Sequence, residues 1–293
     1  MRDAGGFRLM GVVNVTPDSF SDGGLFLDPG AAVAHGWRLA QEGAEILDVG
    51  GESTRPGADP VGAEEELRRV LPVVEGLAAM ASGAVISIDT SKASVARAAL
   101  GAGATLVNDV TALRGDPEMP GVVAQSGAEC CLMHMLGEPR TMQRGVGEVG
   151  GVGGVGRVGG PQYKDVVDDV KAFLEQRLAF AVAEGIAEER VLLDPGIGFG
   201  KTLEHNLQLL RRLSELAVLG RPLVVGTSRK SFIGRILAAA GTVSEPVDVA
   251  GRLPGTIATC VLAYERGARV LRVHDVAPVR AALEVAAATL GAR

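Results

Sequence analysis

Short apolar runs that end on a polar residue recur along this chain. The first, Met10–Val13, ends on Asn14 and is followed by a loop rich in Asp, Ser and Gly. An apolar run of this length, bounded by turn residues, is typical of a buried strand with the polar residue at its C-terminal end. Eight strands are predicted: Met10–Val13, Glu45–Gly51, Ala84–Thr90, Thr105–Val110, Glu129–Met135, Arg190–Pro195, Pro222–Thr227 and Arg269–Val276.

Helical periodicity separates these strands. Apolar residues recur at three- and four-residue steps between Leu67 and Leu77, which predicts an amphipathic helix over Ala63–Ser82. Asp28 followed by Pro29 is typical of a helix start, and Ser91 is expected to cap the helix after the third strand. The other predicted helices cover Asp28–Gly43, Asp116–Ser126, Tyr163–Glu184, Leu203–Leu216, Ser231–Ala240, Arg252–Arg266 and a last segment from Pro278.

Strands that alternate with helices predict an α/β protein with a parallel sheet, and eight such units close into a (β/α)8 TIM barrel. A doubly wound open sheet is the alternative. No shift in composition marks a domain boundary, so residues 1–293 are expected to form a single domain. Gly145–Gly160 interrupts the pattern with Gly/Val sequence of low complexity, which we interpret as a flexible insertion in the fifth βα loop. Its letters match a dinucleotide-binding fingerprint only because glycine is so frequent there, and no helix begins at that point.

Composition excludes several classes of protein. The chain has 293 residues, of which 47% are hydrophobic and 22% charged, so it buries a large core and is too polar for a membrane protein. A net charge of -6 and an aromatic content of 3% argue against a nucleic-acid partner. Three cysteines, two of them adjacent, fit neither a disulfide framework nor a zinc site and are expected to be buried. The N-terminus lacks an apolar signal core, so a cytoplasmic location is expected.

The polar residues at the predicted strand ends form a chemical set. In a barrel these ends share one face, where ligands bind. Asp89, Asn108 and Asp194 supply acceptors and one amide donor, which suits a flat heterocycle with several N–H groups, such as a 2-amino-4-oxopyrimidine edge. Lys230 is placed to donate to a ring oxygen or nitrogen. Each residue alone is explained equally well as a helix cap or turn residue, but the set exceeds what capping needs.

A second group of residues is basic. Arg55, Arg272 and His274 would provide positive charge near Asn14, which suits a phosphate or pyrophosphate. A Mg²⁺ ion that keeps most of its waters is a natural bridge to such a ligand. For Arg272 and His274, a local surface ion pair with Asp275 is the alternative explanation.

Two other kinds of site are rejected. Gly196–Thr202 resembles a phosphate-binding P-loop, but residue 195 is proline where that motif requires glycine, so a Gly-rich turn is expected. Lys230 stands between Arg229 and Ser231, which do not give it the desolvated surroundings of a Schiff-base lysine.

Eight segments of the chain resemble the signature segments of the dihydropteroate synthase family, in the family's order. They are Asn14–Gly24, Asp48–Ala58, Ser87–Lys92, Val107–Val110, Leu132–Gln143, Leu193–Lys201, Thr227–Phe232 and Arg272–Val276. Together they cover nearly the whole chain outside the Gly/Val insertion. The resemblance implies a pterin-binding TIM barrel of folate biosynthesis. Its reaction joins 6-hydroxymethyl-7,8-dihydropterin pyrophosphate to p-aminobenzoate and releases pyrophosphate, which makes the enzyme a transferase.

The resemblance also implies roles for individual residues. The pterin would be held by Asp89, Asn108, Asp194 and Lys230; the pyrophosphate by Thr54, Arg55, Arg272 and His274, with Asn14 as the Mg²⁺ ligand; and p-aminobenzoate by Phe20, Asp22, Pro56, Phe199 and Ser231. The residues with catalytic roles would be Asp22, Arg55, Asp89, Lys230, Arg272 and His274. The p-aminobenzoate pocket is also the pocket for sulfonamides in this family. A homodimer is implied, and the apolar helix over Ile257–Tyr264 is a candidate for its contact.

Two other functions are considered. A pterin-binding methyltransferase that acts on methyltetrahydrofolate and a corrinoid protein would share the barrel and the acids. It has no pyrophosphate to bind, so Arg55 and the segments Thr227–Phe232 and Arg272–Val276 argue against it. A non-catalytic paralogue that binds a pterin is the second alternative. Pyrophosphate release from the two substrates and magnesium separates all three.

Overall fold

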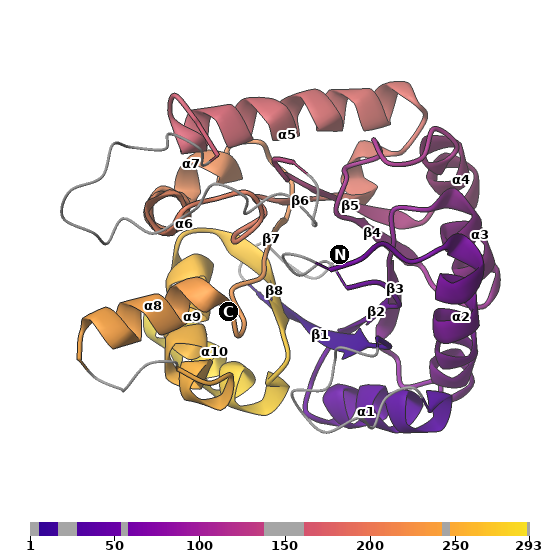
Figure 1. Ribbon diagram of the computed structural model, residues 1–293, viewed down its shortest axis with the longest axis horizontal. Helices are drawn as coiled ribbons and strands as arrows, with labels where there is room; N and C mark the ends of the chain where they lie inside the picture. The colour runs from indigo at the N-terminus through magenta and orange to yellow at the C-terminus, as the bar shows by residue number, and fades with distance from the viewer. Residues whose placement is uncertain (1–5, 17–27, 54–57, 138–160, 242–246, 292–293) are drawn as a thin grey trace.

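Eight parallel strands close into one barrel in chain order (Figure 1). The structure is a computed structural model and describes residues 6–16, 28–53, 58–137, 161–241 and 247–291. The strands are β1 (Arg8–Asn14), β2 (Ile46–Gly50), β3 (Val85–Asp89), β4 (Leu106–Asp109), β5 (Glu129–Met133), β6 (Val191–Asp194), β7 (Leu223–Val225) and β8 (Ala268–Val273). The predicted Gly/Val insertion lies outside the described residues.

Helices surround the barrel as an outer ring (Figure 1). They are α1 (Pro29–Gln41), α2 (Ala63–Ala79), α3 (Ala93–Gly101), α4 (Met119–Ser126), α5 (Val166–Ala183), α6 (Leu203–Arg211), α7 (Ser214–Ala217), α8 (Ser231–Ala239), α9 (Leu253–Glu265) and α10 (Val276–Leu290), with 3-10 turns η3 (Glu188–Arg190) and η4 (Ala250–Arg252). Within the described residues, no helix has the length and apolar character that crossing a membrane requires.

Pairing of the first strand with the last decides between the two predicted architectures. Met10 in β1 pairs with Ile46 in β2, and Arg8 in the same strand pairs with Val270 in β8, both in parallel register. A doubly wound open sheet has two edge strands that each pair on one side only, whereas here each of the eight strands pairs with two neighbours and β8 pairs back to β1. The prediction of a single (β/α)8 barrel is therefore confirmed, and the doubly wound alternative is wrong.

Two apolar layers hold the barrel together. Alternate residues of each strand point to opposite sides, so one set packs under the helices and the other fills the interior. The interior set is Met10, Ile46, Leu106, Cys131, Leu192, Val224 and Val270, with Val85 packed against it. All three cysteines are buried and free, as expected. Because side chains fill the interior, a ligand has room only above it, where the strands end.

Several helix boundaries differ from the prediction. Ser91 does not cap α3, because Lys92 occupies the N-cap position and the Ala93 N–H donates to Asp116 Oδ2 at 2.9 Å. The second oxygen of Asp116 accepts from Glu118 N–H at 3.0 Å, so Asp116 belongs to a turn and α4 begins only at Met119. The predicted helix over Leu203–Leu216 is two helices, α6 and α7, and the last helix begins at Val276, two residues earlier than expected.

Candidate functional site

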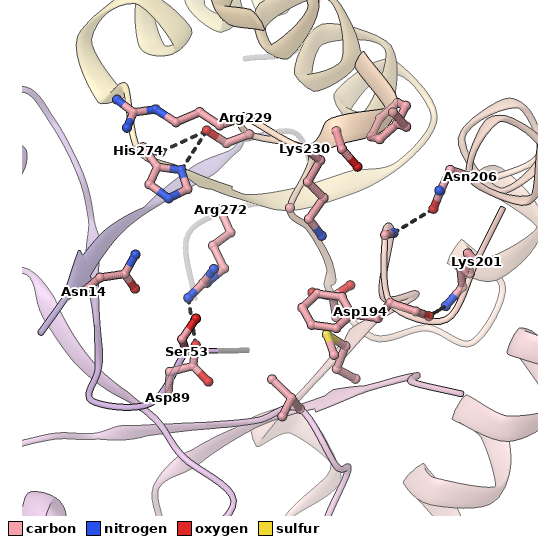
Figure 2. Close-up of a pocket in the computed structure, with 18 of the residues that line it drawn as sticks. Asn14, Ser53, Asp89, Asp194, Lys201, Asn206, Arg229, Lys230, Arg272 and His274 are labelled. Atoms are coloured by element: carbon pink, nitrogen blue, oxygen red, sulfur yellow. Dashed lines mark hydrogen bonds and ion pairs between the residues drawn. The ribbon is translucent and has the colours of Figure 1, made fainter. Parts of the chain in front are cut away.

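A cavity of about 360 Å³ opens at the C-terminal ends of the strands. Figure 2 shows side chains from many parts of the chain pointing into it. The polar residues that line it include Asn14, Ser53, Asp89, Asn108, Asp194, Lys201, Asn206, Ser228, Lys230, Ser231, Arg272 and His274. The structure therefore brings the predicted strand-end residues together. Of the predicted site residues, Phe20, Asp22, Thr54, Arg55 and Pro56 lie outside the described residues.

Acceptor groups line the cavity at the ends of three strands. Asp89 and Asp194 are the last residues of β3 and β6, and Asn108 is the third residue of β4. Gly196 N–H donates to Asp194 Oδ1 at 2.7 Å, which fixes the plane of that carboxylate. Apolar side chains of Val110, Met133 and Phe199 line the same cavity and belong to one small cluster. Polar edges beside an apolar wall suit a flat ring with hydrogen-bonding groups on its rim.

Arg272 joins two of the acids across the barrel. Its Nε donates to Asp48 Oδ2 at 2.6 Å. Its Nη2 donates to Asp89 Oδ2 at 2.8 Å (Figure 2). Asp48 is fully buried and also accepts from Ser87 Oγ at 2.6 Å and from Asn108 Nδ2 at 3.0 Å. The suggested ion pair of Arg272 with Asp275 is wrong, because Asp275 pairs with Arg229 instead. Asp48 thus connects Arg272, Ser87 and Asn108 through hydrogen bonds, a role that its place within an apolar run does not indicate.

Burial shifts the charge equilibria of these groups. Burial, followed by the nearby Asp48 carboxylate, raises the pKa of Asp89 to about 8, although Arg272 acts in the opposite direction. Burial also raises the pKa of Asp194. The same cause lowers the pKa of Lys230 to about 8, with Asp194 opposing it. Burial lowers the pKa of Arg272, but Asp48 and Asp89 more than compensate and keep its guanidinium charged.

The turn after β6 is held by a buried lysine. Gly196, Gly198 and Gly200 all have positive φ, and Lys201 Nζ donates to Gly196 O at 2.9 Å and to Phe199 O at 3.1 Å. The same ammonium lies 2.9 Å from His134 Nδ1. Lys201 is only 2% exposed, and burial lowers its pKa well below the usual value. The prediction of a Gly-rich turn is confirmed, and the ammonium of Lys201 stabilises that turn by donating to its carbonyl oxygens.

Replacing Gly196 by alanine is expected to destabilise the protein far more than the same change at Gly220. Both residues have left-handed φ, 66° and 72°. A Cβ at Gly196 would lie 1.8 Å from His134 O, whereas nothing lies within 4 Å of a Cβ at Gly220. Backbone strain alone costs about 1 kcal/mol, so the Gly220 variant should lose about that much stability. Chemical denaturation measures both, and equal losses would contradict the steric argument.

The turn between β7 and α8 supplies the opposite wall. Lys230 is the N-cap residue of α8, and its Nζ donates to Ile197 O in the turn after β6. The same ammonium lies 4.6 Å from the centre of the Phe199 ring. Ser231 is the first residue of α8, and it also lines the cavity. Lys230 lies across the cavity from Asp89 (Figure 2).

Two further predicted residues lie at the ends of β1 and β8. Asn14 is the last residue of β1, and His274 directly follows β8. The Nδ1 atom of His274 lies 3.0 Å from Ser228 Oγ, which also accepts from His274 N–H at 3.2 Å. Figure 2 places Asn14 and His274 on the same side of the cavity, with Arg272 between them and Lys230. An amide, an imidazole and a guanidinium at one end of a cavity can bind an anion.

Comparison with known proteins gives consistent matches over nearly the full length. The family model described as "Pterin binding enzyme" matches residues 10–274. The dihydropteroate synthase of Escherichia coli strain K12 is 44% identical over 286 residues, covering 98% of this chain and 93% of that protein.

Solved structures agree in fold. The Xanthomonas albilineans dihydropteroate synthase with 4-aminobenzoic acid superposes with a TM-score of 0.84 at 46% identity, covering 98% of this chain and 94% of the other. The Yersinia pestis dihydropteroate synthase with a sulfonamide drug complex gives a TM-score of 0.86 at 43% identity, covering 97% and 94%.

Proposed function

This chain belongs to the dihydropteroate synthases, a family of pterin-binding enzymes, and from that membership we propose how its residues carry out the reaction. It is a transferase that condenses 6-hydroxymethyl-7,8-dihydropterin pyrophosphate with p-aminobenzoate. The products are 7,8-dihydropteroate and pyrophosphate. The observation that carries the residue roles is the single cavity in which Asp89, Asn108, Asp194 and Lys230 meet.

The acceptor side of the cavity binds the pterin. The 2-amino-4-oxopyrimidine edge offers several N–H groups, and a carboxylate accepts two parallel bonds of this kind. Asp194 is fixed by Gly196 N–H so that its second oxygen remains for a ligand. Asn108 adds an amide, and Lys230 donates to a ring oxygen or nitrogen. The apolar wall that contains Met133 packs against the ring face.

The anion side holds the pyrophosphate. Asn14 and His274 lie there, with Arg272 beside them. The family resemblance assigns Thr54 and Arg55 to the same anion. The bond between the pterin methylene and the pyrophosphate oxygen breaks, and its electron pair leaves with the pyrophosphate. Fixed positive groups stabilise the charge that grows on the departing oxygens. The positive charge left on the methylene spreads into the pterin ring and is favoured by the nearby Asp89 carboxylate.

The arylamine binds between the turns that carry Phe199 and Ser231. The family resemblance assigns Phe20, Asp22 and Pro56 to the same substrate. Its amine is neutral at working pH, so its lone pair attacks the methylene without a strong base beforehand. The nitrogen becomes acidic once alkylated, and its proton passes to Asp22 or water. Sulfonamides resemble the arylamine, so we propose that they inhibit by competing for this pocket.

The donor set suits a Mg²⁺ ion that arrives with the pyrophosphate. Among the described residues, no cluster of three His, Cys, Asp or Glu side chains could hold a metal by itself. Mg²⁺ commonly keeps several waters and binds through one or two protein oxygens plus substrate phosphates, which fits the single amide oxygen of Asn14. When bound, the ion would neutralise charge on the leaving group.

Pterin affinity is expected to pass through a maximum near pH 8. The pKa values of Asp89 and Lys230 are both about 8, so the carboxylate forms as pH rises toward 8 and the ammonium is lost above it. Affinity therefore rises on the acid side and falls by up to about tenfold per unit on the alkaline side. In the Lys230→Gln variant, the fall in pterin affinity above pH 8 should disappear, while the rise in affinity below pH 8 should remain. Calorimetric titration of the protein with the pterin, from about two pH units below to about two above the shared pKa near 8, measures the affinity on both sides of the maximum.

The overall reaction has a direct test. Purified chain is mixed with pterin pyrophosphate, p-aminobenzoate and magnesium, and pyrophosphate and dihydropteroate are quantified. We expect equal amounts of both products. Pterin binding without product would support a non-catalytic paralogue, and transfer of a methyl group from methyltetrahydrofolate would support the methyltransferase alternative.

We also propose a cytoplasmic homodimer. Apolar side chains are exposed on three neighbouring helices: Ile236 on α8, Leu262 on α9, and Val285 and Leu290 on α10. Leu262 belongs to the segment Ile257–Tyr264 that the sequence suggests for the contact. Sedimentation of the purified chain should give twice the mass of one chain, and a monomer at micromolar concentration would exclude the dimer.

A further inference from the structure

Arg229 has a backbone conformation that non-glycine residues rarely adopt. Its φ is 61°, in the left-handed region, and it lies in the turn between β7 and α8. A non-glycine residue in this region is strained, and such strain persists only where the surroundings impose it. Strained residues of this kind cluster at functional sites, and Arg229 directly precedes Lys230 and Ser231.

Three separate contacts hold this residue in place. Arg229 N–H donates to Thr256 Oγ1 at 3.2 Å, and Arg229 O accepts from Arg252 Nη1 at 2.9 Å. The guanidinium of Arg229 makes a two-pronged ion pair with Asp275, with Nε to Oδ2 at 3.0 Å and Nη2 to Oδ1 at 2.8 Å. The contacts come from α9, from η4 and from the residue before α10, which are three elements outside the turn.

The ion pair differs from an ordinary surface pair. The two side chains are only 25% and 24% exposed, and both oxygens of the carboxylate are used. A paired fork of this kind fixes direction as well as distance. By contrast, the Arg97–Glu118 pair is 61% and 69% exposed and rests on one short contact. Asp275 therefore restrains the side chain of Arg229, while Arg252 and Thr256 restrain its backbone.

The restrained peptide sets where the next two residues point. Lys230 N–H donates to Thr227 O at 3.2 Å, which closes the turn, and the Lys230 side chain then crosses to Ile197 O. A change of Arg229 to a right-handed conformation would redirect the chain at Lys230 and at the first turn of α8. Both substrates would then lose a contact, since Lys230 faces the pterin side and Ser231 the arylamine side.

We propose that Asp275 is a positioning residue for this reaction, which keeps Arg229 left-handed and so aims Lys230 and Ser231 into the cavity. The inference rests on the roles proposed above for Lys230 and Ser231. Asp275 itself does not line the cavity, but its partner Arg229 does. Its effect on substrates must therefore pass through Arg229.

A double-mutant cycle tests this route. The proteins compared are the unmodified chain, Asp275→Asn, Arg229→Gly and the double variant, each assayed for the p-aminobenzoate KM, kcat and the pterin Kd. Glycine accepts the left-handed conformation without restraint. We expect Asp275→Asn alone to raise the KM and the Kd about tenfold, because a small misplacement of binding groups has effects of at least this size. In the Arg229→Gly background the same change should alter either constant by less than about twofold.

Several outcomes would overturn the proposal. An equal effect of Asp275→Asn in both backgrounds would show that it does not act through Arg229. An unchanged or lower KM would show that the turn stays in place and that the freed guanidinium attracts the substrate carboxylate. Glu118→Gln is the control, because it removes an ion pair far from the turn and should change neither constant. If Asp275→Asn does not fold, Arg252→Gln takes its place in the same cycle. Lack of activity in the unmodified chain would instead refute the proposed function.

Discussion

Replacing Arg272 by methionine should lower the free energy of unfolding by about 3–5 kcal/mol. The guanidinium is the shared partner of Asp48 and Asp89, and the two carboxylates are 0% and 10% exposed. Removing one partner of a buried ion pair leaves an uncompensated charge that water cannot reach. Here two acids lose their cation at once, and they would repel each other as well. Methionine fills a similar length without a charge, so the loss is chiefly electrostatic.

The loss has a pH signature that a packing defect lacks. Arg272 opposes the rise in the pKa of Asp89, so without it that pKa should rise above its present value of about 8, and the folded variant then binds this proton more tightly than the unfolded chain does. A raised folded pKa gives stability that is present below the unfolded value, near 4, and is lost as pH rises through the folded value. The unmodified protein releases this proton near pH 8 and the variant holds it longer, so urea denaturation at about pH 6 and about pH 9.5 should show a larger deficit at the higher pH.

Arg97→Met is the matched control. Arg97 pairs with Glu118 at the surface, so its loss should cost about 0–1 kcal/mol. An Arg272→Met variant as stable as this control, or with the same deficit at both pH values, would contradict the structural role of the pair.

Replacing Asp194 by asparagine should weaken pterin binding about 100-fold with little change in stability. Asparagine has the same shape, and its oxygen can keep the 2.7 Å bond from Gly196 N–H. Its amide nitrogen then occupies the place of the second carboxylate oxygen and faces the N–H groups of the pterin. The amide N–H of the asparagine and an N–H of the pterin would then face each other where the unmodified chain has a charged acceptor. A lost hydrogen bond to a charged group is worth about 1.5–3 kcal/mol.

Asp116→Asn provides the same chemical change away from the cavity. Asp116 also accepts from the N–H two residues ahead, and its second oxygen accepts from Ala93 N–H. This variant should lose stability but bind the pterin normally. Fluorescence titration with the pterin measures the affinity of both variants. Equal affinity of the Asp194 and Asp116 variants would show that Asp194 does not bind the pterin.

Much of this arrangement follows from local sequence pattern. Asp89, Asn108 and Asp194 could be placed at one face because each ends an apolar run, and the parallel barrel brings such ends together. Asp28 could be recognised as an N-cap because the signal is local, and its side chain does accept from Gly30 N–H.

Other features depend on contacts that no local pattern carries. Asp48 and Arg272 are 224 residues apart, and Lys201 and His134 are 67 apart. Nothing near Ser91 indicates that Asp116, rather than Ser91, accepts the hydrogen bond from Ala93 N–H at the N-terminus of α3. In the same way, the letters around Arg229 do not indicate a left-handed residue, because Thr256, Arg252 and Asp275 impose that conformation from elsewhere. The roles assigned to Phe20, Asp22, Thr54, Arg55 and Pro56 stay predictions.

The pairing of β1 with β8 has a consequence for synthesis on the ribosome. Translation makes β1 first, but the strand that completes its pairing ends only at Val273. Throughout elongation the growing polypeptide therefore carries an open edge on β1 and two acids, Asp48 and Asp89, whose cation has not yet been made. A stalled or truncated product that ends before β8 cannot close, and it exposes strand edges of the kind that aggregate. β8 thus supplies both the closing strand and the counter-charge of the active site.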